Sequence, residues 1–318
     1  MSVYTTVSQQ QLKDFLALYP LGNLISFKGI KDGIENTNYK VTTTQGNFIL
    51  TIFESLTAKE LPCYLLLLNY LAQIDFPAPN PQKSEKGQYL STLIGKPAAL
   101  FNCLSGYSIE NPSHSQCEEV GAYLAKLHLC SDKHDFQKPN SKNLAGCQSV
   151  FNKIRSSLSK DEIRLLISEL SFQASYSFPV IPQGLIHADL FKDNVLFNNG
   201  RISGILDFYN ACNDYFLFDI AVTCNDWCID NEIINQKKVK ALLCGYSKIR
   251  QLNDDERKHF TVFLRLAALR FWLSRLEHLL NPKEGELTLA KDPLVFRRLL
   301  EYHRANMELC NDKCLPAN

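Results

Sequence analysis

The sequence predicts an α+β protein of two lobes, a small strand-rich lobe over residues 1–104 and a larger, mostly helical lobe over residues 105–318. Three observations lead to this prediction. The 318 residues exceed the size at which a single hydrophobic core usually stops growing. Strand patterns separated by turn residues fill the first third of the chain, and beyond Leu104 the apolar residues recur at helical spacing. We expect a cleft between two such lobes.

The elements of the first lobe follow in a clear order. A helix opens the chain, because Ser8 and Gln11 are spaced as a capping box ahead of an apolar face. LISFKGI, IENTNYKVTTT and NFILTIF predict three strands, with a tight turn at QGN, residues 45–47. A leucine-rich helix is expected over about residues 59–74. The strands QYLSTLI and PAALFNCL then flank a Gly95–Lys96 hairpin turn, which gives a small antiparallel sheet with one main helix.

The second lobe begins with predicted helices over residues 113–129 and 161–170. Two short strands, NVLF and RISGILDF, follow on either side of the turn residues NNG. A series of helices is expected from residue 215 to the end of the chain. Apolar residues surround the helix TVFLRLAALRFWLSRLEHLL on nearly all sides, which indicates a buried helix.

Composition restricts the kind of partner. A formal net charge of +1, with 21% charged residues, gives no electrostatic reason to expect nucleic acid or an anionic membrane. The N-terminus lacks a signal-peptide pattern, and no apolar run approaches the roughly twenty residues of a membrane span. Eleven scattered cysteines favour reduced, buried thiols over a disulfide framework or a zinc site. We therefore expect a cytoplasmic protein that binds neither nucleic acid nor membrane.

The stretch GLIHADLFKDNVLF carries the chemistry. His187, Asp189 and Asn194 have the spacing H-x-D-x-x-x-x-N of the kinase catalytic loop, and Asp207 follows thirteen residues after Asn194 at a strand end. Phosphoryl transfer needs hard oxygen ligands for Mg²⁺ and a separate carboxylate for the attacking hydroxyl. Asp189 is therefore the candidate base, Asn194 and Asp207 are the candidate metal ligands, and His187 is expected to brace the loop. The alternative is a set of turn-forming residues.

Nucleotide binding is expected in the first lobe, with the active site in the cleft. Two glycines between the first strands would let the backbone fold over phosphates, although the full glycine-rich pattern is absent and a simple Gly-Asp turn is the alternative. Polar residues after them offer further donors, and the connection after the last strand offers backbone groups for adenine. The candidates are Gly29, Gly33, Asn36, Thr37, Asn38, Phe101 and Cys103.

These motifs resemble the aminoglycoside-phosphotransferase-like group of small-molecule kinases, which share the protein-kinase fold. Phe191 stands where protein kinases carry the catalytic-loop lysine. The blocks IENTNY, FILTIFE, GKPAALFNCLSG, LDFYNACNDYFLFDIA and LRFWLSRL resemble, in order, the bacterial homoserine kinases of this fold. The resemblance covers nearly the whole chain. It implies an ATP- and Mg²⁺-dependent enzyme that phosphorylates the side-chain hydroxyl of L-homoserine to O-phospho-L-homoserine, in threonine biosynthesis.

One departure from the general kinase pattern concerns the phosphate-binding lysine. Its place in FILTIFE is occupied by Thr51, as it is in the homoserine kinases that the chain resembles. Another cation must then take this role, or Mg²⁺ must carry more of the charge. Lys28, Lys31 and Lys40 are the cations available nearby in the sequence.

Homoserine presents a carboxylate, an ammonium and a hydroxyl, so its site should offer a guanidinium, acceptors and a base. Arg270 and Arg275 lie in the buried helix, where each needs a partner; the resemblance favours a substrate carboxylate for Arg270 over an internal salt bridge. Tyr209, Asn210 and Asp214 follow Asp207 and should line the same cleft, although Asp214 also suits the N-cap of a helix starting at 215. Asp219 resembles the buried aspartate that supports the catalytic loop in kinases.

Two other functions stay open. The first keeps the chemistry and changes the acceptor to choline, a thiosugar or an aminoglycoside, for which an acidic cleft would be expected in place of an arginine-bearing helix. The second is an inactive kinase-like module that only binds nucleotide. Thr51 favours that module, whereas Asp189, Asn194 and Asp207 favour an enzyme.

Overall fold

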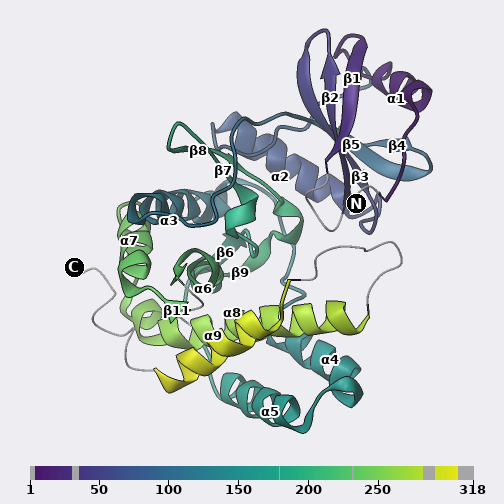
Figure 1. Cartoon of the computed structure of the whole chain (residues 1–318). Helices are drawn as coiled ribbons and strands as arrows, with labels where there is room; N and C mark the ends of the chain where they lie inside the picture. Colours follow the sequence, from purple (N-terminus) through teal and green to yellow (C-terminus); the bar gives the residue numbers. More distant parts are fainter. Residues whose placement is uncertain (1–3, 31–35, 179, 231–232, 282–290, 307–318) are drawn as a thin grey trace. The chain divides into compact units, whose positions relative to one another are not determined.

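The computed structural model of the chain describes residues 4–30, 36–178, 180–230, 233–281 and 291–306 (Figure 1). Contacts between Cα atoms divide these residues into two units. The first unit comprises the described residues up to Gly106 together with Ser203–Leu206, and the second comprises Tyr107–Ile202 and the described residues after Leu206. Their secondary structure confirms the predicted α+β class.

The first unit is built on a five-stranded antiparallel sheet in the order β1-β2-β3-β5-β4. α1 packs its apolar side on one face of this sheet, and Figure 1 shows α2 along the other side. The Ser8–Gln11 capping box of α1 is present as predicted. The elements are α1 Gln9–Leu16, β1 Leu24–Ile30, β2 Asn36–Thr43, β3 Gly46–Phe53, α2 Leu61–Gln73, β4 Ser91–Leu93 and β5 Lys96–Asn102.

Both predicted hairpin turns of this sheet were placed too late in the sequence. Thr43 pairs with Gly46, so the first turn consists of residues 44 and 45 and not of 45–47. Leu93 pairs with Lys96, and the second turn is Ile94–Gly95, not Gly95–Lys96. Both of its residues have positive φ, 52° and 74°. A two-residue turn of this kind needs a left-handed conformation at both positions. Ile94 adopts this unfavourable conformation because Lys96 is paired with Leu93 in the sheet and cannot belong to the turn.

The two faces of the sheet carry different side chains. Tyr39, Val41, Leu50 and Ile52 point into a core with the buried residues of α1. Because strand residues alternate between faces, Asn36, Asn38 and Lys40 of β2 point to the opposite face. Thr51 lies opposite Asn38 on that same face.

The second unit is mainly helical. α6 is buried along almost its whole length and packs against α8, α3 and α7. α3 and α7 approach closely, because Gly121 and Gly245 each face the backbone of the other helix with no room for a Cβ atom. The helices are α3 His114–His128, α4 Leu144–Ile154, α5 Lys160–Ala174, α6 Phe216–Trp227, α7 Gln236–Ser247, α8 Asp254–Leu280 and α9 Leu294–Ala305.

Short strands position the loops of the second unit. β6, Gln183–Ile186, pairs antiparallel with β9, Cys212–Tyr215, so that Ile186 lies opposite Cys212. β7, Val195–Asn198, and β8, Arg201–Ile205, form a hairpin with Asn199 and Gly200 at its turn, as predicted from NNG. A third pair, β10 Ile229–Asp230 with β11 Ile233–Ile234, follows α6. Within the described residues, no helix is both long and apolar enough to cross a membrane.

Candidate active site

The loop between β6 and β7 carries Asp189 and Asn194. Ala188, directly before Asp189, has a φ of 63°, and Asp207 has a φ of 60°. Neither residue is a glycine or belongs to a hairpin turn, and a left-handed conformation there costs of the order of 1 kcal/mol or more. Such strain persists only where the surroundings impose it. The contacts of this loop show how it is imposed.

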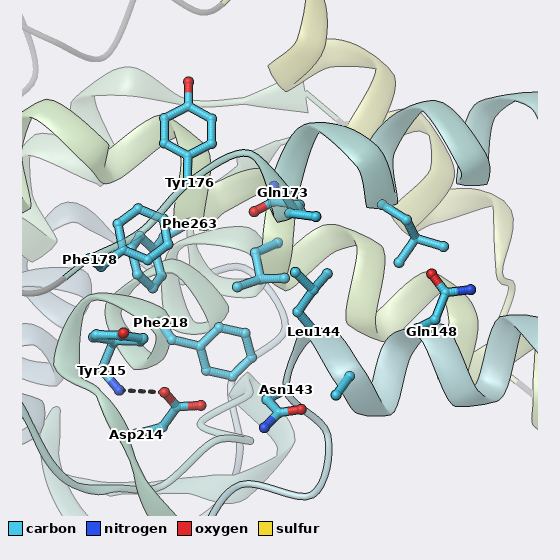
Figure 2. Close-up of a pocket in the computed structure, with 14 residues that line it drawn as sticks. Asn143, Leu144, Gln148, Gln173, Tyr176, Phe178, Asp214, Tyr215, Phe218 and Phe263 are labelled. Atoms are coloured by element: carbon cyan, nitrogen blue, oxygen red, sulfur yellow. Dashed lines mark hydrogen bonds between the residues drawn. The ribbon is translucent and has the colours of Figure 1, made fainter.

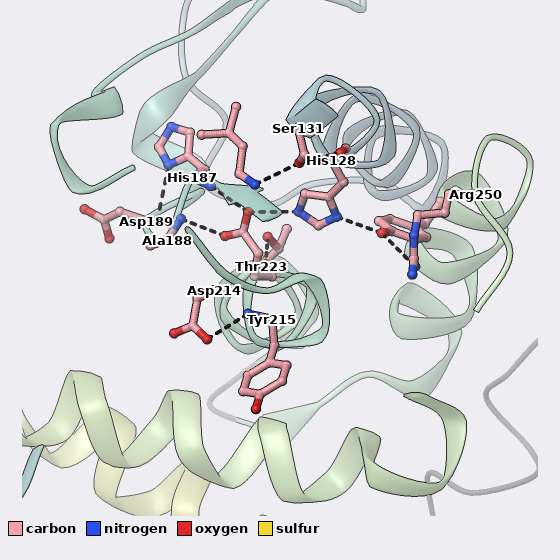
Figure 3. Close-up of polar contacts among 12 residues, drawn as sticks. His128, Ser131, His187, Ala188, Asp189, Asp214, Tyr215, Thr223 and Arg250 are labelled. Carbon is pink, nitrogen blue, oxygen red and sulfur yellow. Dashed lines mark hydrogen bonds and ion pairs between the residues drawn. The ribbon is translucent and has the colours of Figure 1, made fainter. Parts of the chain in front are cut away.

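Asp219 of α6 fixes the strained peptide (Figure 3). Its Oδ2 accepts a hydrogen bond from the backbone N–H of His187 at 2.7 Å, and its Oδ1 accepts one from that of Ala188 at 2.8 Å. The carboxylate is fully buried, so these two charge-assisted bonds are not exchanged for water. Asp219 therefore holds the backbone directly before Asp189.

The C-terminal end of α6 holds the rest of the loop. The indole N–H of Trp227 donates to the carbonyl of Leu190 at 3.0 Å, and the carboxylate of Asp226 accepts from the backbone N–H of Lys192 at 2.7 Å. Burial raises the pKa of Asp226, an effect that the neighbouring Lys192 opposes. One helix thus fixes the catalytic loop at three separate points.

His187 joins the loop to the segment that bears Asp207. Its Nδ1 accepts a hydrogen bond from the backbone N–H of Asp189 at 3.3 Å, and the side chain is fully buried. The imidazole ring also lies 4.6 Å, between centroids, from the ring of Phe208. These contacts fit a brace and not a proton-transfer group.

Asn194 has an orientation that suits a metal ligand. Its Nδ2 donates to the carbonyl of Asp189 at 2.9 Å, which turns the side-chain oxygen Oδ1 away from that carbonyl. Asp207 supplies a carboxylate at the start of the turn after β8. An amide oxygen and a carboxylate are the hard donors that Mg²⁺ prefers, so the donor set fits this ion.

The side chain of Asp189 also contacts Asn210, in the segment that follows Asp207. Asn210 donates from Nδ2 to Oδ2 of Asp189 at 3.2 Å, and its Oδ1 accepts from Nζ of Lys142 at 2.6 Å. A lysine only donates and a carboxylate only accepts, so both ends of the amide are assigned. Tyr209 lies in the same turn, where burial first and the charge of Asp207 second raise the pKa of its phenol. Sequence reasoning missed Lys142, which belongs to no motif and lies 68 residues from Asn210.

Asp214 does not cap α6. The N-cap is Tyr215, without a side-chain hydrogen bond, so the alternative role predicted for Asp214 was wrong. Its Oδ1 accepts from the backbone N–H of Tyr215 and its Oδ2 from Nδ2 of Asn140, each at 2.7 Å. Burial raises the pKa of Asp214, and the hydrogen bond from Asn140 opposes that shift.

Asp214 also lines a cavity of about 560 Å³ in the second unit (Figure 2). α4, α5, α6 and α8 form its walls. Five aromatic rings give it a largely apolar surface, and Asp214 is the one charged side chain among the described residues that line it. The rings are those of Tyr176, Phe178, Tyr215, Phe218 and Phe263.

Arg270 is buried, with 5% of its surface exposed, and its guanidinium carbon lies 3.6 Å from the centroid of the Phe271 ring. Burial raises the pKa of the Cys147 and Cys212 thiols to about 12, and the charge of Arg270 opposes this shift in both. Cys147 lies in α4 and Cys212 in β9, so the charge of Arg270 acts on groups of both elements.

The candidate phosphate-binding residues of the first unit separate onto the two faces of the sheet. Asn38 accepts a hydrogen bond from Thr51 at 2.8 Å, so a neutral pair fills the place of the usual lysine. Thr37 points to the opposite face, fully buried, where its hydroxyl donates to Glu54 at 2.6 Å. Its side chain is thus committed to the fold, and only its backbone is available to a nucleotide.

The other candidates of this unit are placed by strand register. Gly29 pairs with Tyr39, and Lys28 pairs with Lys40. Asn36 accepts a weak hydrogen bond from the backbone N–H of Glu54 at 3.4 Å. Gly33 and Lys31 lie outside the described residues.

The connection after β5, where adenine is expected to bind, has only some of its backbone groups free for a ligand. Phe101 is buried within β5, opposite Ile49. The backbone N–H of Cys103 donates to the carbonyl of Asn47 at 3.2 Å, so this donor is already used. The backbone carbonyls of the connection are therefore better candidates for hydrogen bonds to adenine than the N–H of Cys103.

A buried network extends from Asp219 away from the loop (Figure 3). Nε2 of His128 bonds to Oδ2 of Asp219 at 3.1 Å, and Nδ1 bonds to the hydroxyl of Tyr246 at 2.7 Å. Burial lowers the pKa of His128 in spite of the opposing Asp219, which favours neutral imidazole with its proton on Nε2. Arg250 donates to the Tyr246 hydroxyl and pairs with the buried Glu256. Sequence reasoning did not find this support.

We expect Asp219→Asn to lower the free energy of unfolding of the second unit by about 1–3 kcal/mol, because an amide cannot accept from both backbone N–H groups and from His128. Tryptophan fluorescence during urea unfolding measures this, since the chain's two tryptophans, Trp227 and Trp272, are both buried there. Asp161→Asn is the control, because its side chain is 69% exposed. Equal stability of the two variants would contradict the role of Asp219.

Known proteins resemble this chain in sequence over most of its length. The profile of the phosphotransferase enzyme family matches residues 26–252. A protein named homoserine kinase from Methylobacillus flagellatus is 42% identical over 312 residues, which cover 97% of each chain. Another of that name, from Neisseria meningitidis serogroup B, is 40% identical and covers 94% of this chain and 99% of its own.

Solved structures show the fold. Amicoumacin kinase hAmiN, in complex with AMP-PNP, Ca²⁺ and Ami, has a TM-score of 0.73 at 16% identity and covers 98% of this chain and 96% of its own. Choline kinase from Cryptosporidium parvum has a TM-score of 0.72 at 15% identity, with coverage of 97% and 98%. The predicted kinase-like fold is therefore confirmed.

Proposed function

Because the chain belongs to the phosphotransferase enzyme family, we propose that it transfers the γ-phosphoryl group of ATP to the side-chain hydroxyl of L-homoserine, giving O-phospho-L-homoserine. The observation that carries the acceptor is the identity of 42% and 40%, over nearly the full chain, to proteins named homoserine kinase. The geometry around Asp189 supports the reaction class. The cytoplasmic location expected from the sequence stays a prediction.

Asp189 acts as the base in this proposal. Its carboxylate orients the homoserine hydroxyl and accepts the hydroxyl proton as the oxygen attacks the γ-phosphorus. The hydrogen bond from Asn210 to Oδ2 leaves Oδ1 as the oxygen for the substrate. Asp219, Trp227 and Asp226 hold the loop, so little reorganisation accompanies the reaction.

Asn194 and Asp207 would hold Mg²⁺ through side-chain oxygens. When bound, the ion neutralises phosphate charge and aligns the γ-phosphoryl group. Nδ2 of Asn194 is committed to the Asp189 carbonyl, so its Oδ1 is the ligand atom. This places a metal ligand and the base on one short, rigid loop.

The first unit would bind the nucleotide. Gly29, Gly33, Asn36 and Asn38, with the backbone of Thr37, lie along the first two strands and the connection between them. Thr51 cannot pair with phosphate charge, whereas Lys28 and Lys40 lie opposite each other on the face that bears Thr51 and Asn38. Like charges placed directly opposite are unfavourable unless an anion lies between them, which favours this pair as the replacement cations.

Tyr209, Asn210, Asp214 and Arg270 form the acceptor side of the site. Asn210 contacts Asp189 directly, and Asp214 is a half-buried carboxylate that suits an ammonium group. The buried guanidinium of Arg270 adds positive charge near Cys212, which lies between Asn210 and Asp214 in the sequence. Choline carries no carboxylate and would gain nothing from this charge, which favours homoserine as the acceptor.

A coupled ADP-release assay with ATP and Mg²⁺ tests the acceptor. L-homoserine, L-serine, L-threonine, choline and an aminoglycoside are compared at equal concentration, and we expect the largest kcat/KM for L-homoserine. Faster release with choline or the aminoglycoside would establish the alternative acceptor. Release stimulated by none of the five would indicate a nucleotide-binding module without activity.

A further inference from the structure

Residues 138–142 run beside the segment 210–214 in the second unit. The backbone N–H of Lys138 donates to Oδ1 of Asn213 at 2.8 Å, and the backbone N–H of Asn213 donates to the carbonyl of Lys138 at 2.6 Å. Pro139 forms a parallel bridge with Asn213. The two segments are thus joined by their backbones, which fixes the side chains that follow.

Two side chains of this segment reach across to the site. Asn140 donates from Nδ2 to Oδ2 of Asp214 at 2.7 Å, and Lys142 donates from Nζ to Oδ1 of Asn210 at 2.6 Å. Asn140 is 7% exposed, and its Oδ1 accepts from the backbone N–H of Lys142 at 2.7 Å. The segment 138–142 therefore carries one cation, Lys142, and through Asn140 it contacts one anion, Asp214.

The cation is close to the base. One amide, that of Asn210, separates Nζ of Lys142 from Oδ2 of Asp189, with bonds of 2.6 and 3.2 Å on its two sides. In L-homoserine, covalent geometry places the carboxylate carbon about 5 Å from the hydroxyl oxygen, with the ammonium on the carbon between. A hydroxyl on Asp189 therefore brings the carboxylate within the range of Lys142.

Resting on the proposed function, we infer that Lys142 binds the α-carboxylate of the acceptor and that Asp214 binds its α-ammonium. Lys142 and Asp214 then select amino-acid acceptors over simple alcohols and amines, because only a zwitterion pairs with both of these charges. Lys142 keeps its exposed position, where a ligand can reach it, and exchanges the neutral Asn210 oxygen for a carboxylate oxygen. A charged acceptor makes the stronger hydrogen bond.

Three other cations of the described residues, Lys291, Arg275 and Arg270, are less suited to this contact. Lys291 forms an ion pair with Asp193, and Arg275 donates to the carbonyl of Asp292 at 2.8 Å. Arg270 is buried and stacked on Phe271, so it adds positive potential from beneath the segment without an exposed surface for the ligand.

Lys142→Met tests the carboxylate contact when kcat/KM is measured with L-homoserine and with its carboxamide, which lacks the negative charge. We expect a loss of about 10- to 100-fold with homoserine, mainly in KM, and less than about 3-fold with the carboxamide. Lys142→Arg keeps the positive charge and should retain most of the wild-type kcat/KM with homoserine. Lys153→Met is the matched control, since Lys153 of α4 forms an exposed ion pair with Glu277 of α8, and it should change neither value.

Asp214→Asn tests the ammonium contact in the same way, with 4-hydroxybutyrate as the acceptor that lacks the amine. We expect kcat/KM to fall by about 10-fold or more with homoserine and to change little with 4-hydroxybutyrate.

An equal fall in the kcat/KM of Lys142→Met with homoserine and with its carboxamide would overturn the inference. Lys142 would then only support Asn210. The wild-type turnover of homoserine tests the proposed function separately, because the inference depends only on ratios between variants.

Discussion

Replacing Asp189 with asparagine is expected to lower kcat by about 10²- to 10⁴-fold, the range for loss of a general base. The amide keeps an oxygen that accepts from Asn210, so the loop should retain its shape while the hydroxyl proton loses its acceptor. KM for ATP should stay nearly unchanged, because Asp189 is not assigned to the nucleotide. Steady-state ADP release with L-homoserine measures kcat, and calorimetric titration with ATP and Mg²⁺ measures nucleotide binding.

Asp193→Asn is the matched control for this variant. Asp193 lies in the same loop, is exposed, and forms an ion pair with Lys291, so the same chemical change there should leave kcat close to the wild-type value. A similar loss in both variants would mean that general disturbance of the loop, and not loss of the base, is measured. Wild-type kcat in Asp189→Asn would contradict the assignment outright.

Replacing Asp207 with alanine should abolish Mg²⁺-dependent turnover, because it removes the carboxylate assigned to the metal. Alanine is also strained at the φ of 60° found here, whereas asparagine tolerates this conformation. Asp207→Asn therefore separates the two effects: it keeps the backbone and one oxygen but loses the charge. We expect it to retain weak activity with a higher half-saturating Mg²⁺ concentration, measured by Mg²⁺ titration of ADP release.

Asp135→Ala serves as the control, since Asp135 is exposed in the same unit and has no assigned role. Its Mg²⁺ titration should match that of the wild type. Full activity of Asp207→Ala with Mg²⁺ and ATP would remove Asp207 from the metal site. Loss of activity in Asp207→Asn without any change in the Mg²⁺ requirement would assign Asp207 a different role.

Local sequence patterns were sufficient for most elements of the first unit, and the spacing of Asp189, Asn194 and Asp207 led to roles that stay predictions. The strand patterns placed β1 at its observed residues, Leu24–Ile30, and the capping box located the start of α1. The turns were less accurate, because Ile94 takes a left-handed conformation that its own preference disfavours. Tertiary pairing of Leu93 with Lys96 determined that turn, and a local pattern contains no information about such pairing.

Two further residues beside the site, Lys142 and His128, could not be found from local patterns. Lys142 lies 68 residues from Asn210, and His128 lies 91 residues from Asp219, and neither belongs to a recognisable motif. For Thr37 the local pattern was misleading. Its position after the glycines suggested that its hydroxyl donates to phosphate, but the alternation of side chains along the strand turns this hydroxyl to the other face of the sheet. Buried networks form from residues that only the fold brings together.

The proposed reaction is phosphorylation of the side-chain hydroxyl of L-homoserine by this chain. Phosphorus NMR of the reaction with ATP, Mg²⁺ and L-homoserine tests it most directly, because the spectrum identifies the atom that receives the phosphoryl group. We expect one new phosphomonoester signal, coupled to the two protons of the side-chain methylene group, that grows in step with ADP. A spectrum with ADP and inorganic phosphate alone, or with no change when homoserine is added, would contradict the claim.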